Sequence, residues 1–254
     1  ARGFAAMAQK APNDTLKEIY TYFHAEEQRH ANAEMALMKR WGMLDGDRIP
    51  EPNKNLKLVI QWLDRYSDDM PLEVLGSVIP MLEIALDGAL CTFLLETVDD
   101  PVCHQAFAKI NDDESRHLGV GFHVLELQGH GPVYLKTLKT LGTLADPRLI
   151  LGIASYVPLL NRMRDNIIEM GLGEERLYAA MKKFERIGGR TQEGRNNPWY
   201  QIISRHGRMV VNRGNRLYHT PVDAMVKMTD RVPAWALPSR VPTWVKGITY
   251  KPTA

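Results

Sequence analysis

The sequence predicts an all-α protein, in which a bundle of long helices is followed by further helices. Several stretches with apolar residues three or four positions apart run for about 25 residues, a length that suits a long helix bundle. Residues that cap or end helices, such as Asn13 and Gly42, bound these stretches. No stretch shows sustained alternation of apolar and polar residues between turn signals, so strands are not required.

Four helices are expected in the first half of the chain. Asn13–Thr15 has the character of a helix N-cap, and Asp100 precedes a proline at the start of the fourth helix. The third helix contains Pro80, whose ring and missing N–H predict a kink near that position. The expected ranges are 14–41, 55–66, 72–98 and 102–128.

Four more helices are expected in the second half, before an irregular tail. Two of them begin at prolines, Pro147 and Pro198, which suit the first turn of a helix. From residue 232 onward prolines and tryptophans replace the helical pattern. We therefore expect one helical domain over residues 1–231 and a tail over 232–254. The expected helices cover 133–144, 147–171, 174–187 and 198–219.

Composition favours a globular protein of the cytoplasm. A hydrophobic fraction of 44% and a charged fraction of 24% are ordinary for such a protein, and no uninterrupted run of about 18 apolar residues marks a transmembrane helix. Cys91 and Cys103 are too few for a disulfide framework, which favours reduced thiols in the core. The chain starts without a methionine or a secretory leader, and we expect its natural beginning to lie upstream of Ala1.

Positive charge gathers toward the C-terminal end. Residues 186–254 hold 12 Lys or Arg and three acids, a balance of +9, so residues 1–185 carry −7 of the overall +2. A solvated surface, a docking face for an anionic partner, and a peripheral membrane contact that involves Trp235 and Trp244 all remain open. Nucleic-acid binding is not expected, because no recognition motif accompanies the charge.

The most informative feature for function is a short motif that occurs twice. Residues 26–30 read Glu-Glu-Gln-Arg-His, and residues 113–117 read Asp-Glu-Ser-Arg-His. Because residues i and i+3 share one face of a helix, each motif directs one carboxylate and one imidazole to the same point. Two such faces that meet inside a bundle provide ligands for a dinuclear iron or manganese site. The candidate ligands are Glu27, His30, Glu114 and His117.

A lone acid in an apolar helix provides a fifth candidate ligand. Glu83 lies within the segment 80–86, which is too apolar for a surface helix. Burying an isolated carboxylate is costly, so it should be paired, protonated or bound to a metal ion. We expect Glu83 to bridge two metal ions, and pairing with an arginine is the structural alternative.

Residues beside the candidate ligands have expected supporting roles. A metal-bound histidine usually donates its other ring N–H to a carboxylate, which fixes the orientation of the ring. We expect these contacts to run crosswise between the two helices, from Glu26 to His117 and from Asp113 to His30. The surplus negative charge would be neutralised by Arg29 and Arg116, and Asp87 is expected to support the site from outside the ligands or to pack between helices.

The paired motifs resemble those of the ferritin-like di-iron carboxylate superfamily, in particular its oxygen-activating branch. The order motif, lone Glu, motif, with spacings of 56 residues (27 to 83) and 31 residues (83 to 114), is most similar to soluble acyl-carrier-protein desaturases and related di-iron oxygenases. The resemblance covers about residues 14–130. It implies a ferritin-like four-helix bundle there, with additional helices over about 133–220.

The resemblance also implies an oxidoreductase. Its site would hold two iron ions, with manganese or a mixed pair as the alternative, and would activate O2. The reaction would be hydroxylation, as in a monooxygenase, desaturation or N-oxygenation of an organic substrate, which an acyl carrier protein or coenzyme A could carry. Electrons would come from a separate reductase or ferredoxin, because no flavin, nicotinamide or iron–sulfur motif is present. A homodimer is one possible assembly.

Two other classes remain as alternatives to the enzyme. One is a ferroxidase or iron-handling ferritin-like protein, and the other is a scaffold subunit without metal. The chain continues for more than 130 residues after the second motif, which favours a substrate pocket over simple iron storage. If the two motifs were solvated faces of charged helices, the metal site itself would not exist.

The family pattern contains one more glutamate, on a helix that precedes the first motif. Residues 1–13 contain no acid, so we expect this sixth ligand on a helix before Ala1. Other residues could complete the site instead. These alternatives are Asp87, one turn after Glu83, and Asp165 and Glu169 on a later helix.

Overall fold

The computed structural model describes residues 1–44 and 51–237, with the backbone alone for residues 85–87. Over the described residues the chain is helical and contains no strand, which confirms the all-α class. Within the same residues no helix combines the length and apolar character needed to cross a membrane. Of the expected tail, residues 238–254 lie outside the described residues.

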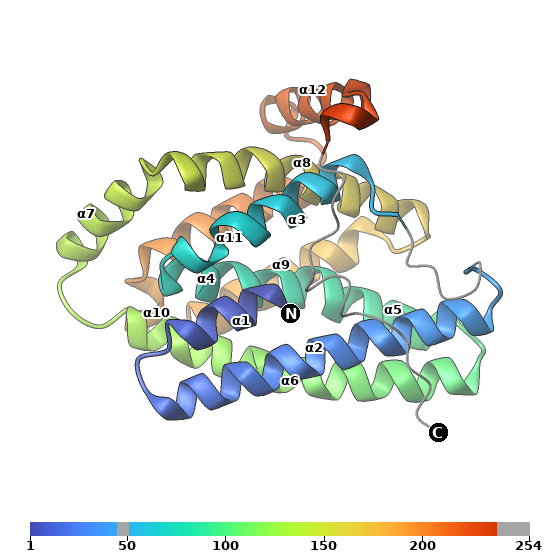
Figure 1. Cartoon of the computed structure of the whole chain (residues 1–254). Coiled ribbons are helices and arrows are strands. Elements are labelled where there is room, and N and C mark those ends of the chain that lie inside the picture. Colours follow the sequence, from blue (N-terminus) through green and yellow to red (C-terminus); the bar gives the residue numbers. More distant parts are fainter. Residues whose placement is uncertain (45–50, 238–254) are drawn as a thin grey trace.

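Two long helices, α2 (Asp14–Arg40) and α6 (Pro101–Gln128), lie side by side (Figure 1). Side-chain contacts join residue 26 to 117 and residue 30 to 113, so the two helices run antiparallel. Both begin at predicted caps. The side chain of Asn13 accepts a hydrogen bond from the Leu16 N–H, and the side chain of Asp100 accepts one from the Val102 N–H.

A helix that the sequence analysis did not predict, α1 (Arg2–Gln9), packs along α2 (Figure 1). Its Phe4 is buried in one apolar cluster with Tyr20 and Phe23 of α2. The helix has eight residues and no side-chain cap at its N-terminus. Because such a short helix is marginal without tertiary contacts, it is stabilised by packing rather than by local sequence preference.

The expected helix over 72–98 is divided by a π-helical turn. α4 (Leu72–Leu82) and α5 (Ala89–Thr97) are separated by η2 (Glu83–Gly88). Pro80, near which a kink was expected, stays inside α4, and the π-helical turn begins three residues later. π-helical turns are rare and occur frequently at functional sites, and this one begins at the candidate ligand Glu83.

The later helices pack against α4, α6 and one another. The expectation of one helix over 198–219 was wrong, because the helix ends before Asn212 and a new one begins after Asn215, whose side chain caps it. A one-turn helix, α10, was also not predicted. The bounds are α3 (Lys54–Tyr66), α7 (Val133–Leu144), α8 (Pro147–Glu169), α9 (Glu174–Gly188), α10 (Gln192–Arg195), α11 (Pro198–Val211) and α12 (Arg216–Arg231), with short turns η1 (Ser67–Asp69) and η3 (Ala234–Ala236).

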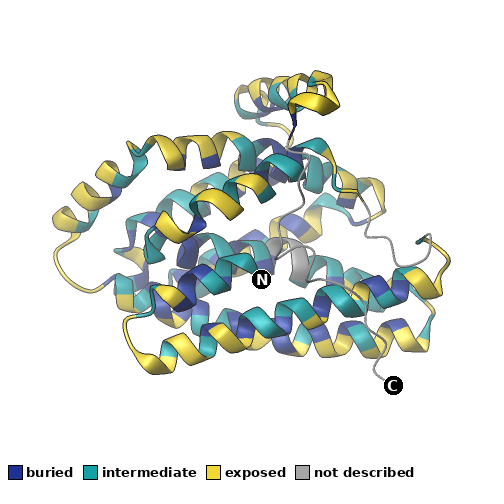
Figure 2. Ribbon diagram, in the orientation of Figure 1, coloured by how far each residue is buried: buried dark blue, intermediate teal, exposed yellow. Residues whose placement is uncertain are grey.

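Buried side chains gather between the helices, and the outer helix faces are exposed (Figure 2). One apolar cluster joins α1, α2 and α4 to Trp199 of α11. A second joins Met81 and Phe122 to side chains of α8, α9 and α11, including Phe184 and Tyr200. The later helices therefore share core with the helices that carry the two motifs.

Candidate metal centre

The two motifs meet between α2 and α6, and Glu83 reaches them from η2. The Nδ1 atom of His117 lies 3.4 Å from Glu114, 3.6 Å from Glu27 and 3.6 Å from Glu83. On the other side, the Nδ1 atom of His30 lies 3.1 Å from Glu114 and 3.6 Å from Glu27. All five candidate ligands expected from the sequence thus lie in one cluster.

The cluster is largely buried, and several of its polar atoms have no partner. His117 is 1% exposed and Glu83 and Glu114 are each 5% exposed, whereas Glu27 is half-buried. Among the described residues, three atoms of the cluster lack a hydrogen-bond partner: His117 Nδ1, Glu83 Oε2 and Glu114 Oε2. Unpartnered buried polar atoms are costly, and three at one point suit the ligand atoms of a cation. The burial argues against solvated helix faces.

The donor set itself suits a metal ion. Glu27, Glu114 and His117 each offer one ligand atom, and these atoms all lie within 4.8 Å of one another. Imidazole nitrogen with carboxylate oxygen is a ligand set that suits first-row transition metals. The geometry therefore supports at least one metal ion at this cluster.

Both imidazoles are oriented by an acid from the opposite helix. The Nε2 of His117 lies 3.1 Å from Glu26, and the Nε2 of His30 lies 3.1 Å from Asp113. With Nε2–H donating in each case, both Nδ1 atoms are left to face the cluster. These are the crosswise contacts expected from the sequence. Such outer partners fix the tautomer of a ligating histidine.

Arginine side chains neutralise part of the outer charge. Arg116 donates from Nη2 to Glu26 and to Asp113, each at 2.6 Å, and so links the two outer acids. Arg29 lies 3.6 Å from Glu26 with its side chain 56% exposed, which makes it the weaker contact. Lys109 also lies 3.4 Å from Asp113. With neutral imidazoles the five carboxylates still outnumber these three cationic side chains, so the centre retains an excess of negative charge.

Without a metal ion the carboxylates hold protons on the two histidines. Burial by itself lowers the pKa of His30, but hydrogen bonds to Glu114, Glu27 and Asp113 outweigh it and raise that pKa to about 10. Burial also lowers the pKa of His117, and there the neighbouring carboxylates of Glu114 and Glu83 raise it to about 10.

Two of the glutamates are shifted in opposite directions. Burial raises the pKa of Glu83 to about 7. Burial would raise the pKa of Glu27 as well, but His30 and other nearby positive charge lower it to about 2.

Aromatic side chains close the centre on the side of α1. The ring centroids of Phe23 and Phe4 lie 4.1 Å and 5.2 Å from that of His117. Tyr20 is 1% exposed, and burial raises the pKa of its hydroxyl to about 12, so it stays protonated. This wall of aromatic side chains keeps water from His117.

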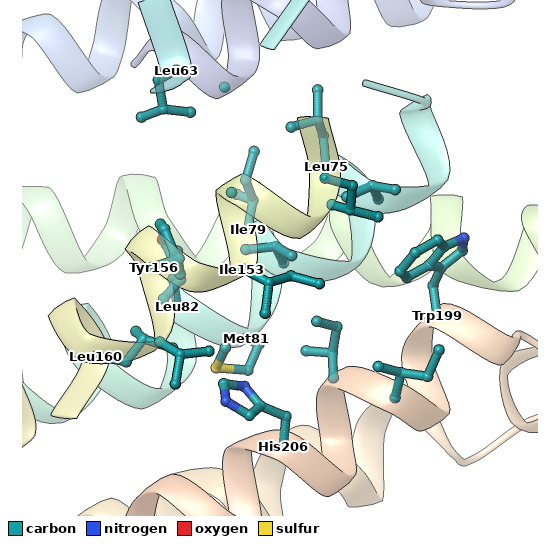
Figure 3. Close-up of a pocket in the computed structure, with 18 of the residues that line it drawn as sticks. Leu63, Leu75, Ile79, Met81, Leu82, Ile153, Tyr156, Leu160, Trp199 and His206 are labelled. Atoms are coloured by element: carbon teal, nitrogen blue, oxygen red, sulfur yellow. The ribbon is translucent and has the colours of Figure 1, made fainter. Parts of the chain in front are cut away.

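A cavity of about 640 Å³ adjoins the centre, and Glu27 and Glu83 form part of its wall. From there it extends between α3, α4, α8 and α11, where apolar side chains point into it (Figure 3). His206 is one of its few polar lining groups. Its Nε2 lies 2.9 Å from the Tyr218 hydroxyl, and burial lowers the pKa of His206, which favours the neutral ring. The sequence analysis expected a substrate pocket but, apart from Glu27 and Glu83, identified none of its lining residues, because they come from separate helices.

Of the alternative sixth ligands, two lie outside the carboxylate–histidine cluster and one lies outside the described side chains. Asp165 forms an ion pair with Arg164 (2.7 Å), in a polar cluster with His219, and Glu169 is exposed. The side chain of Asp87 lies outside the described residues. Helix α1 lies beside the first motif, but its residues 2–9 contain no acid, so α1 does not provide the sixth ligand.

Comparison of the chain with family models, with curated proteins and with solved structures gives no match.

Proposed function

We propose that this chain is a ferritin-like di-iron oxidoreductase that activates O2 to hydroxylate, desaturate or N-oxygenate an apolar organic substrate. The observation that carries the proposal is the position of the carboxylate–histidine cluster in the wall of an apolar cavity. Ferritin-like di-iron proteins place Glu-x-x-His motifs on two helices and single glutamates on the other two. The motifs on α2 and α6, with Glu83 at the start of η2, support this assignment.

The excess of negative charge in the cluster supports the binding of two divalent cations. We assign iron, with manganese as the alternative, because carboxylate and imidazole suit both metals. When bound, the metal pair would supply the O2 chemistry, and electrons would come from an external donor. The residues that would hold the ions are Glu27, His30, Glu83, Glu114 and His117.

The protein's own contribution is to position groups and to exclude water. Glu26 and Asp113 keep the two Nδ1 atoms directed at the cluster. Phe4 and Phe23 shield His117 from water. Ligands held in this way need no rearrangement to bind metal, and a dry site strengthens every electrostatic interaction within it.

The cavity supports oxidation of a substrate over storage of iron. Its volume of about 640 Å³ lies in the range of sites for small organic molecules. Hydrated iron ions would gain nothing from an apolar passage, whereas an apolar molecule is stabilised there by burial. A substrate in this cavity would lie against Glu27 and Glu83, next to the proposed metal ions.

Metal content tests the proposal directly. Full-length protein produced with iron should contain close to two iron ions per chain by elemental analysis, and Glu114→Ala should lower this to one or none. Asp112→Ala is the matched control, because Asp112 lies on the same helix but is exposed. Unchanged iron in Glu114→Ala would overturn the assignment. A large cage on size-exclusion chromatography would favour iron storage instead.

A further inference from the structure

Helix α7 exposes its apolar side chains and buries a polar one. Tyr134, Leu135, Leu138 and Leu141 are 66%, 51%, 62% and 57% exposed, and Thr140 is the one buried residue of this fully described helix. An amphipathic helix on a globular protein normally turns its apolar face to the core. α7, at the edge of the molecule, therefore has the opposite orientation, with its apolar side chains directed away from the core (Figures 1 and 2).

The exposed apolar side chains continue from α7 onto the start of α8, after a two-residue turn. Ile150, Leu151 and Ile153 are 52%, 53% and 43% exposed. Ile153 also lines the large cavity, as does Leu144 at the end of α7. The apolar surface of α7 and early α8 thus continues into the wall of the cavity. Exposed apolar surface of this extent usually marks a site of interaction.

The charge of α7 favours an anionic occupant. The helix contains two lysines, Lys136 and Lys139, and no acid. Lys136 donates to the carbonyl groups of Gly129 and Gly131, and Lys139 pairs with Glu73 of α4 at an exposed site, where such an ion pair is weak. A bilayer with anionic lipids offers an apolar interior for the leucines and negative headgroups for the lysines, which is how interfacial amphipathic helices bind.

We propose that α7 and the start of α8 bind the surface of a membrane that contains anionic lipid. The leucines of α7 enter the headgroup region, and the cavity opens beside them toward the lipid. An apolar compound can then pass between the bilayer and the cavity without crossing water. This membrane contact does not depend on the metal centre, because none of its residues belongs to the carboxylate–histidine cluster.

Sedimentation of the full chain with lipid vesicles tests the proposal. The protein should bind vesicles of phosphatidylcholine with phosphatidylglycerol, and bind more weakly to phosphatidylcholine alone. Leu138→Asp with Leu141→Asp should weaken binding at least about tenfold, because charged side chains are not accommodated in the apolar part of the interface. The matched control is Leu217→Asp with Met228→Asp on α12, where the side chains are 93% and 68% exposed.

The results of these experiments distinguish a membrane from a second copy of the chain as the binding partner of α7. All four substituted positions are exposed, so circular dichroism and iron content should stay as in the wild type, and the milder pair Leu138→Ser with Leu141→Ser should show the same trend in binding. Wild-type protein that stays in solution with both kinds of vesicle would overturn the proposal. So would a dimer, detected by light scattering, that the α7 variants dissociate. Equal binding by the α7 and control variants would also reject it.

Discussion

Each histidine of the centre is oriented by the acid that precedes the glutamate ligand on the opposite helix. The two contacts have the same length, 3.1 Å, and each leaves Nδ1 directed at the cluster. An imidazole without such a partner could rotate or take the other tautomer, and either change would remove a ligand atom. The two outer acids therefore matter for metal affinity although they would not touch the metal.

Removing one outer acid should weaken metal binding without abolishing it. In Asp113→Ala, His30 loses the carboxylate that holds its Nε2, and the affinity for iron should fall by about 10–100-fold. Competition with a chelator of known affinity measures this loss. Asp112→Ala should keep wild-type affinity, since Asp112 is exposed. Equal affinities for the two variants would contradict the positioning role.

The raised pKa values of the two histidines predict how the stability of the metal-free protein depends on pH. The pKa of His30 and of His117 is about 10 in the folded protein against 6.5 ordinarily, so the folded state binds more protons than the unfolded chain between these values. Their stabilisation is complete below pH 6.5 and is lost as the pH rises toward 10. The pKa of Glu83, raised from 4.5 to about 7, acts in the same direction at lower pH.

Urea unfolding after chelator treatment measures this dependence. The free energy of unfolding should be lower at about pH 8 than at about pH 6. Iron-loaded protein should show a smaller loss, because a bound metal ion replaces the protons on both imidazoles. Greater stability of the metal-free protein at the higher pH would show that the carboxylates do not hold these protons.

At the scale of helices, α4 and α6 approach each other closely near the centre. A Cβ atom built on Gly121 of α6 would lie 2.6 Å from the Pro80 ring of α4. α6 carries Glu114 and His117, and η2 with Glu83 follows directly after α4. The absence of a side chain at residue 121 therefore sets the distance between ligands from two helices.

Gly121→Ala should disturb both packing and metal binding. The added methyl group forces α4 and α6 apart, and overpacking of this kind costs about 1–3 kcal/mol. Gly119→Ala on the same helix is the matched control, because no atom lies within 4 Å of a Cβ built there. The control should be neutral or stabilised by up to about 1 kcal/mol from its better helix propensity. Thermal unfolding and iron content of the two variants test the contact.

At the scale of the whole molecule, the cavity exists because distant segments meet. Its wall combines Trp62 of α3, Leu82 of α4, Ile153 of α8 and Trp199 of α11. The first and last of these are more than 130 positions apart in the chain. The helices after the second motif thus complete an apolar chamber beside the carboxylates.

Filling this chamber should block an apolar ligand without affecting the metal. Leu82→Trp enlarges a side chain that lines the cavity (Figure 3). The neutral fluorophore N-phenyl-1-naphthylamine should bind the wild type with enhanced emission, and bind this variant at least about tenfold more weakly. Leu127→Trp, at a position 48% exposed, is the control. Unaltered binding by Leu82→Trp would place the fluorophore outside the cavity.

Local patterns in the sequence were sufficient to predict most helices and all five clustered candidate ligands. The period of a helix and the spacing of Glu-x-x-His depend on residues within one or two turns, so one chain displays them directly. Helix α1, the π-helical turn at Glu83 and the break before Asn215 were not predicted. The first depends on packing against α2, and the second lies where η2 packs against α6 and α9. The third depends on a side-chain cap in a segment that otherwise reads as helix.

The cavity and the exposed apolar face of α7 also depend on the tertiary structure and could not be predicted from local sequence. The apolar residues of α7 resemble those of any amphipathic helix, and only the packing of the other helices leaves them exposed. The doubled motif could thus predict a carboxylate–histidine cluster from sequence, because the Glu and His of each motif lie one helical turn apart. The chamber beside it required the fold, since contacts between distant segments carry no periodic pattern along the chain.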